Sequence, residues 1–351
     1  MKPSGIGGQA VIEGVMMKNK KEYAIAVRKP DQQIEVKKEQ YVSFADKHRI
    51  FRLPILRGML AFVESMKIGM STITYSASFY EDEEETKPSR LENGMNKIFK
   101  DKADSIFTGV TVFFSVILAV ALFILLPTFL SQKLSTVITS NVLQAVIEGV
   151  IRIAIFIGYV LLISQMKDIK RVFMYHGAEH KTINCIEHGF ELTVENVRFQ
   201  SKQHKRCGTS FLLIVMFFSI VFFMFIRIDT FWLKSVVRIL LIPVIAGLSY
   251  EFLRLAGRSE NKVITILSQP GLWLQGLTTR EPDDAMIEVA IASVEAVFDW
   301  RGFLGLEAEK EQESEESKIK KGKVSDNMNK KPQPAQDKED ILETLDKYFG
   351  E

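Results

Sequence analysis

The stretch HGAEH places His176, Glu179 and His180 at the spacing of a metal site. Histidines four residues apart lie on one face of a helix, so both imidazoles can bind the same ion. A carboxylate one residue before the second histidine can polarise a bound water molecule or orient a ligand. The motif therefore predicts a divalent metal, with zinc as the first candidate, and Glu179 as a catalytic base or orienting group.

The loop that follows contains side chains that could complete the metal shell. If a helix continues from the preceding apolar run and stops at Gly189, Asn184 and Glu187 lie within roughly 80° of the two histidines, and Cys185 points the opposite way. Cys207 precedes an apolar stretch, where a thiol at a helix N-terminus is a candidate ligand or nucleophile. Three protein ligands would leave a catalytic position open, whereas four would make the site structural. The candidate further ligands are Glu187, His204 and Cys207.

The N-terminal stretch GIGGQAVIEGVMM supplies Glu13 as a second candidate catalytic residue. Only four residues precede Gly5 and no Gly-Lys-Ser/Thr follows, so a phosphate-binding loop is not supported. The closely spaced glycines instead predict a close approach of the backbone to another segment. Glu13 then either projects into a site or pairs with an arginine.

Four apolar runs in the middle of the chain must position these residues. Each has about 20 to 25 residues, the length that a helix needs to cross a hydrocarbon core. The runs are 106–130, 142–165, 209–228 and 231–255. Arg152 and Arg238 interrupt two of them within two turns of the outer end, so their side chains are predicted to extend to the membrane interface. The sequence predicts a mainly α-helical, polytopic membrane protein with about four transmembrane helices.

The positions of lysine and arginine predict the orientation of these runs. The loop 166–208 is rich in both residues, whereas the connections after the first and third runs carry few. Because positive charge favours the cytosolic side, this loop is predicted to be cytosolic, and four crossings place both termini there as well. A net charge of +2 and the lack of a dense basic stripe predict no specific nucleic-acid binding.

The segments outside the apolar runs have distinct patterns. EYAIAVRKPDQQIEVKKEQYV alternates apolar and polar positions around a turn, which predicts a β-hairpin in a small cytosolic N-terminal β element. Pro54 opens an amphipathic helix that lies on the membrane or packs against the bundle. After the fourth run we expect a helix broken at Pro270 and Gly271, then a helix that begins near Asp283 or Asp284. Thr209 or Ser210 is expected to cap the third run.

These patterns divide the chain into seven segments. They are 1–50 (glycine-rich start and hairpin), 51–105 (amphipathic helix and acidic linker), 106–165 (first two spans), 166–208 (cytosolic loop with HGAEH), 209–256 (last two spans), 257–303 (cytosolic helical segment) and 304–351 (a disordered charged tail with a short terminal helix).

The chain resembles the YqhQ family of bacterial membrane proteins. The resemblance covers about residues 3 to 300 and is carried by GGQAVIEGVMM, YHGAEHKTI, RCGTSF and PGLWLQGLTTREPDD, in this order. It implies a multi-pass protein of the bacterial cell membrane, described as a predicted metal-dependent enzyme without an established reaction. The family's marked positions correspond here to Gly7, Gly8, Gln9, Glu13, Gly14, His176, Glu179, His180, Arg206, Cys207, Thr279, Arg280 and Glu281.

Two functions from different classes are consistent with these features. The first is a metal-dependent hydrolytic enzyme that works at the inner membrane surface on a membrane-associated substrate. The second is a non-enzymatic factor that binds protein-insertion, ribosome-associated or other membrane machinery, with histidines that cap, pair or hold a structural ion. The expected partners are the lipid bilayer and a membrane protein complex or a second copy of the chain. A transporter is disfavoured because four spans are few and no inverted repeat is apparent.

Overall fold

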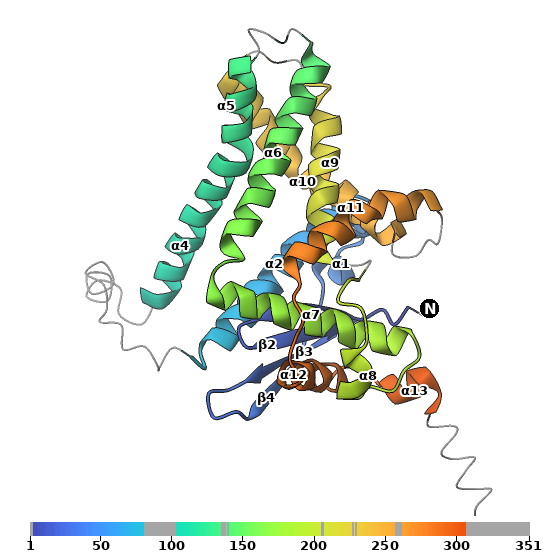
Figure 1. Cartoon of the computed structure of the whole chain (residues 1–351). Helices are drawn as coiled ribbons and strands as arrows, with labels where there is room; N and C mark the ends of the chain where they lie inside the picture. The colour runs from blue at the N-terminus through green and yellow to red at the C-terminus, as the bar shows by residue number, and fades with distance from the viewer. Residues whose placement is uncertain are drawn as a thin grey trace, which may run out of the picture. The chain divides into compact units, whose positions relative to one another are not determined.

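The computed structural model describes residues 3–80, 103–134, 138, 140–204, 207–226, 228, 230–256 and 262–306. It is mainly helical, with one small antiparallel sheet near the N-terminus (Figure 1). The described residues up to Trp300 form one compact unit. The predicted acidic linker and nearly all of the predicted charged tail, including its terminal helix, lie outside the described residues.

The N-terminal sheet has four antiparallel strands in the order β1-β2-β3-β4. The strands are β1 (Gly7–Val11), β2 (Gly14–Asn19), β3 (Glu22–Arg28) and β4 (Ile34–Gln40). The predicted hairpin is β3 and β4, which confirms that prediction. The glycine-rich start forms the other two strands, and Gly14 is needed because a Cβ there would lie 2.3 Å from the carbonyl oxygen of Ala26.

Helices cover both faces of this sheet because β2 and β3 contain continuous runs of buried apolar residues, whose side chains point alternately to the two faces. Met16 and Ile25 are directly paired and pack with Ile68 of α2 (Leu56–Ala77). The opposite face contacts α7 (Lys167–Glu187) and α12 (Asp284–Glu295), where the Ser293 hydroxyl donates to the carbonyl of Ala24. The sheet therefore fixes where α7, the helix with HGAEH, lies.

The helix α2 packs against the apolar helix α10 (Phe231–Ala256) rather than standing alone. A Cβ on Gly58 would lie 2.5 Å from the carbonyl oxygen of Gly247, so only glycine permits this approach. Arg57 Nε donates to a carboxylate oxygen of Glu251 at 3.0 Å across the same contact. Of the two predicted placements, packing against the bundle is the one found.

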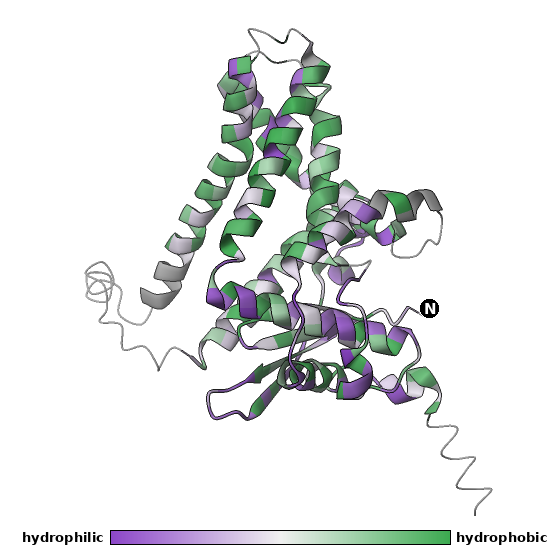
Figure 2. Cartoon of the chain, in the orientation of Figure 1, coloured by the Kyte–Doolittle hydropathy of each residue, from purple (hydrophilic) through white to green (hydrophobic). Residues whose placement is uncertain are grey.

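Three of the predicted spans are helices that are long and apolar enough to cross a membrane (Figure 2). They are the segment Gly109–Lys133, which runs through α4 (Ala103–Val120), a π-helical turn (Ala121–Leu125) and α5 (Leu126–Lys133), then α6 (Asn141–Ile163) and α10. The remaining run forms α9 (Gly208–Phe223), whose 16 residues are fewer than predicted. At 1.5 Å per residue, α9 is about 24 Å long, against about 30 Å of hydrocarbon.

The prediction that Arg152 and Arg238 reach the membrane interface is wrong. Both are buried, and both donate to the buried carboxylate of Glu148. Arg152 also donates to the carbonyl of Phe123 at 2.9 Å, within the π-helical turn, and to Ser219 at 2.8 Å. The two guanidinium groups share one carboxylate because Arg152, one turn after Glu148 on α6, and Arg238 on α10 both reach it.

Three local predictions about the helices also need correction. The helix α7 is not a continuation of α6, because Ser164 to Met166 interrupt them and Met166 has extended backbone. The cap of α9 is Cys207, whose sulfur accepts from the N–H of Thr209 at 3.3 Å. The helix α11 (Lys262–Thr278) is not broken at Pro270 but runs through it. The predicted end of α7 is confirmed, since Gly189 follows the helix with a φ of +86°.

The predicted start of α12 is confirmed. The side chain of Asp283 caps this helix by accepting from the N–H of Met286 at 2.8 Å. The short α8 (Val194–Arg198) lies between α7 and α9, and α13 (Trp300–Leu304) follows α12. Two short helices precede α2: α1 (Phe44–Lys47) and a 3-10 turn (Arg49–Arg52).

Candidate metal centre

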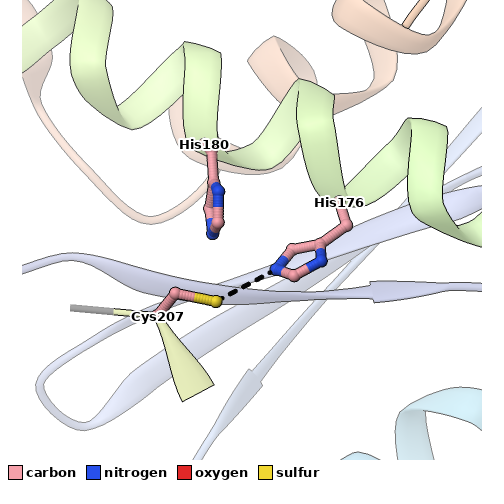
Figure 3. A group of neighbouring side chains, drawn as sticks. All are labelled: His176, His180 and Cys207. Atoms are coloured by element: carbon pink, nitrogen blue, oxygen red, sulfur yellow. Dashed lines mark hydrogen bonds between the residues drawn. The ribbon is translucent and has the colours of Figure 1, made fainter. Parts of the chain in front are cut away.

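Side chains from α7 and from the start of α9 meet at one point. His176 and His180 are one turn apart on α7, with ring centroids 4.4 Å apart. Cys207 reaches them from the N-cap of α9, 27 residues after His180. One potential ligand atom from each residue lies within 4.8 Å of the others, and the three side chains point toward one another in Figure 3.

Backbone carbonyls fix both imidazole rings. His176 Nδ1 donates to the carbonyl of Thr278 at 2.9 Å, and His180 Nδ1 donates to the carbonyl of Lys202 at 2.7 Å. Because a carbonyl can only accept, each Nδ1 carries a proton, so Nε2 is the nitrogen of each neutral ring that could bind a metal. His176 Nε2 lies 3.2 Å from the sulfur of Cys207. This is the arrangement in which histidines ligate metals in proteins.

Burial favours the neutral form of His180. The pKa of His180 is lowered, chiefly because burial disfavours the imidazolium ion. A neutral imidazole is the form that binds a metal, so the fold holds this ring ready to act as a ligand near neutral pH.

Glu179 is buried beside the trio. Its side chain is buried, and a Cβ on Gly8 would lie 2.9 Å from its Cγ, so only glycine lets β1 come this close. Burial raises the pKa of Glu179 to about 7, against opposing contributions from His176 and from a backbone hydrogen bond of Gly8. A carboxyl group with this pKa can both accept and release a proton near neutral pH.

His204 and Glu187 lie together next to the trio but not within it. His204 Nε2 is 3.4 Å from a carboxylate oxygen of Glu187, and its ring centroid is 5.9 Å from that of His180. The N–H and the hydroxyl of Ser4 both donate to the other oxygen of Glu187, at 2.8 and 2.7 Å. These two predicted ligands therefore border the site as a hydrogen-bonded pair.

Glu13 is not brought to the trio. It occupies the turn between β1 and β2 with a φ of 49°, and its carboxylate pairs with the guanidinium group of Arg171. Tyr175 also donates to it, at 3.2 Å. Of the two roles left open by the sequence, pairing with an arginine is the one found. Cys185 also lies elsewhere, with its thiol toward the carbonyl of Glu191.

The trio and Glu179 line one cavity of about 610 Å³. Its walls come from β1, α2, α7 and the start of α9, and Gly7 and Gly8 form part of the lining. His204 contributes to the same cavity, as do Lys18 and Lys20 on β2 and its turn. The cavity is large enough for a small organic substrate beside the three candidate ligands.

The sequence did not reveal which groups hold the site together. The carbonyls of Lys202 and Thr278 carry no side-chain signal, because any residue presents a backbone oxygen. The segment after α11 is fixed against α7: the N–H of Arg280 donates to the carbonyl of Phe173 at 2.9 Å, and a Cβ on Gly177 would lie 2.0 Å from the carbonyl oxygen of Arg280. In the sequence, only the family resemblance pointed to this segment, through the stretch TTRE. Arg206 lies outside the described residues.

A helical protein with three apolar helices, a small N-terminal sheet and a His-His-Cys group is the class that these features define. The model of a family described as protein of unknown function (DUF1385) matches residues 53–300, so the chain belongs to this family.

A curated relative confirms the resemblance found in the sequence. The uncharacterized protein YqhQ of Bacillus subtilis (strain 168) is 36% identical over 294 residues, which cover 83% of this chain and 91% of that protein. No solved structure matches the chain. The comparisons therefore give a family and no reaction.

Proposed function

We propose that this protein is a membrane-bound, metal-dependent enzyme, hydrolytic in its chemistry, whose cavity opens at the cytosolic membrane surface. The observation that carries the proposal is the meeting of His176, His180 and Cys207 in one cavity with the buried carboxyl group of Glu179. Three candidate ligands and a nearby acid or base are the components of a catalytic zinc site.

The donor set fits a tetrahedral zinc ion. Zinc lies about 2.0 to 2.3 Å from nitrogen and sulfur ligands, so two ligand atoms of a tetrahedral site are about 3.5 Å apart. The 3.2 Å between His176 Nε2 and the sulfur of Cys207 is close to this value. Two neutral imidazoles and one thiolate leave the fourth position for a water molecule or a substrate. A divalent ion held here would act as a Lewis acid toward water and a carbonyl or phosphoryl oxygen.

A residue of the protein would then transfer the proton between the water molecule and the leaving group. Glu179, with a pKa of about 7, accepts a proton from the attacking water molecule and returns it to the leaving group. Gly8 holds this carboxyl group through its backbone. Lys18 and Lys20 at the same cavity favour a substrate that carries negative charge.

Contacts in the fold support a location of the N-terminal sheet and of α12 on the same side of a membrane. The helices α7 and α12 contact the same sheet, so these parts share one side of a membrane. The chain between the sheet and α7, and the chain between α7 and α12, must then each cross an even number of times. With α9 as a short crossing helix, this agrees with four crossings, and the basic residues of the loop 166–208 favour the cytosol for this side.

The first test is the metal content of the full-length protein in detergent, purified without chelators. Zinc, iron and manganese are measured for the native chain, for His176→Ala with His180→Ala, and for Cys207→Ser. We expect about one ion per native chain and loss of at least nine-tenths of it in the variants, because each removes a ligand. His188→Ala and Cys185→Ser are the matched controls, since both residues lie on or beside α7 outside the trio.

A second measurement separates an enzyme from a structural ion. Glu179→Gln should retain the metal but lose hydrolysis of ester, amide and phosphoester substrates by about 100-fold or more, because it can no longer take up a proton. A metal-free native chain contradicts the metal site. Bound metal with hydrolysis that is equal in the native chain and in Glu179→Gln would favour the non-enzymatic factor with a structural ion.

A further inference from the structure

We propose that a second cavity, separate from the metal centre, binds the phosphate of an anionic phospholipid headgroup. The cavity has a volume of about 620 Å³ and lies where α6 ends and α7 begins. Its polar lining includes Ser164, Gln165, Lys170, Lys202 and Arg280. None of the residues that we assign to metal binding or proton transfer lines it.

The position of the cavity matches the headgroup layer of a membrane. The helix α6 is apolar and long enough to cross a bilayer, and it ends at Ile163, next to the lining residue Ser164. The lining also includes Leu161 on the last turn of α6. The site therefore rests on the proposed membrane orientation, but not on the metal.

The charge of the cavity favours an anion. Lys170, Lys202 and Arg280 contribute three positive charges against the single carboxylate of Glu281. That carboxylate is already engaged by Lys181 at 2.8 Å and, more weakly, by Lys202 at 3.8 Å. Within the part of the chain that the structure describes, no carboxylate lies within ion-pair distance of Lys170. A phosphate group would balance the remaining charge.

Arg280 is the central residue of this site. Its backbone is fixed, since its N–H donates to the carbonyl of Phe173 and its carbonyl lies against Gly177. Its Nη2 donates to the carbonyl of Ser164 at 3.3 Å, and its Nε is buried without a hydrogen-bond partner among the described residues. A buried donor without an acceptor is costly, so a ligand oxygen would be strongly favoured here. The planar guanidinium group matches the geometry of a phosphate.

The apolar lining favours a lipid over free phosphate. Leu161, Met174 and Leu277 line the cavity beside the charged groups, and the volume exceeds what one phosphate ion needs. An amphiphile whose phosphate contacts Arg280 and whose glycerol and upper acyl carbons contact these residues would occupy both parts.

The test uses native mass spectrometry on the full-length protein in detergent. Short-chain phosphatidylglycerol, phosphatidylcholine of the same chain length and inorganic phosphate are titrated separately. We expect phosphatidylglycerol to bind about tenfold more tightly than phosphatidylcholine, and Arg280→Gln with Lys170→Gln to weaken it by about tenfold or more. Lys167→Gln is the matched control, because Lys167 lies one turn from Lys170 but outside the cavity.

Other results would overturn the lipid site or reassign the cavity. Equal binding of phosphatidylglycerol by the native chain and the double variant overturns the site, and so does equal affinity for the two lipids. Displacement of the lipid by inorganic phosphate at an equal concentration would assign the cavity to free phosphate instead. Arg280→Lys, which keeps the charge but not the fork of donors, should bind with intermediate affinity if the variants remain folded. Retained metal in these variants would separate failure of this site from failure of the metal centre.

Discussion

At the scale of single residues, the chemistry of the candidate site depends on two groups with opposite needs. His180 must remain neutral to act as a ligand, and Glu179 must exchange a proton near neutral pH. Burial supplies both, because it disfavours the charged form of each side chain. In the proposed site, the same burial therefore suits His180 to metal binding and Glu179 to proton transfer.

The raised pKa of Glu179 predicts how stability depends on pH. The folded chain binds this proton more tightly than the unfolded chain, so the stabilising contribution is fully present below about pH 4.5 and is lost as the pH rises through about 7. The total change is about 3 kcal/mol, which corresponds to the shift in pKa. His180 acts in the opposite sense, since its lowered pKa costs stability as the pH falls below 6.5.

Comparison with a variant isolates the contribution of Glu179. Thermal unfolding of the metal-free protein in detergent is measured from pH 4.5 to 8 for the native chain and for Glu179→Gln. The difference in stability between the two should shift steadily in favour of the variant as the pH rises. A difference that does not change with pH would mean that Glu179 titrates normally in the folded protein.

At the scale of elements, a cluster of buried charged side chains connects the apolar helices. Glu148 accepts from both Arg152 and Arg238, and Thr128 donates to it at 3.1 Å while accepting from Arg238 at 2.7 Å. Both guanidinium groups also lie over the ring of Phe223, at 5.0 and 4.6 Å from its centroid. The cluster joins the α4–α5 segment, α6, α9 and α10 through directional bonds.

Removal of the shared carboxylate should destabilise this bundle. Glu148→Ala leaves two buried arginines without their counter-ion, and loss of one partner of a buried pair typically costs about 3 to 5 kcal/mol. The midpoint of thermal unfolding in detergent should fall well below that of the native chain. Glu288→Ala is the control, because its ion pair with Arg28 is at the surface and contributes at most about 1 kcal/mol. Equal midpoints for the two variants would show that the buried cluster does not hold the helices together.

At the scale of the whole molecule, the number of membrane crossings in the proposed topology depends on the short α9. With 16 residues it is the one apolar helix among those described that falls short of the usual span. Yet the sheet contacts both α7 and α12, which precede and follow α9 and α10. An even number of crossings between these contacts requires that α9 and α10 either both cross or both stay on one side.

Reporter fusions test this topology. Alkaline phosphatase, active only outside the cytosol, is fused after Ser140, after Phe190 and after Ile228. We expect activity at the first and third positions and none at the second, as two helical hairpins would require. Activity after Ser140 alone would mean that α9 and α10 do not cross, and activity after Phe190 would reverse the orientation.

Local sequence patterns were sufficient for much of the architecture. The strands β3 and β4, the apolar helices α6 and α10, the cap at Asp283 and the end of α7 at Gly189 all follow from periodicity, length or turn chemistry. The spacing of HGAEH also placed two imidazoles side by side on a helix. These features depend on residues within a few positions of one another, where helix and strand geometry leaves few alternatives.

Tertiary structure decided how distant segments meet. The sequence offered Glu13, Glu187, His204 and Cys207 as partners of the histidines, but only the fold brought Cys207 to them and left Glu13 with Arg171. It also turned Arg238 from the interface into the interior, because a carboxylate on another helix could compensate its charge. Local spacing determined which side chains share a face; long-range packing decided which of them share a site, because the chain between them can close in many ways.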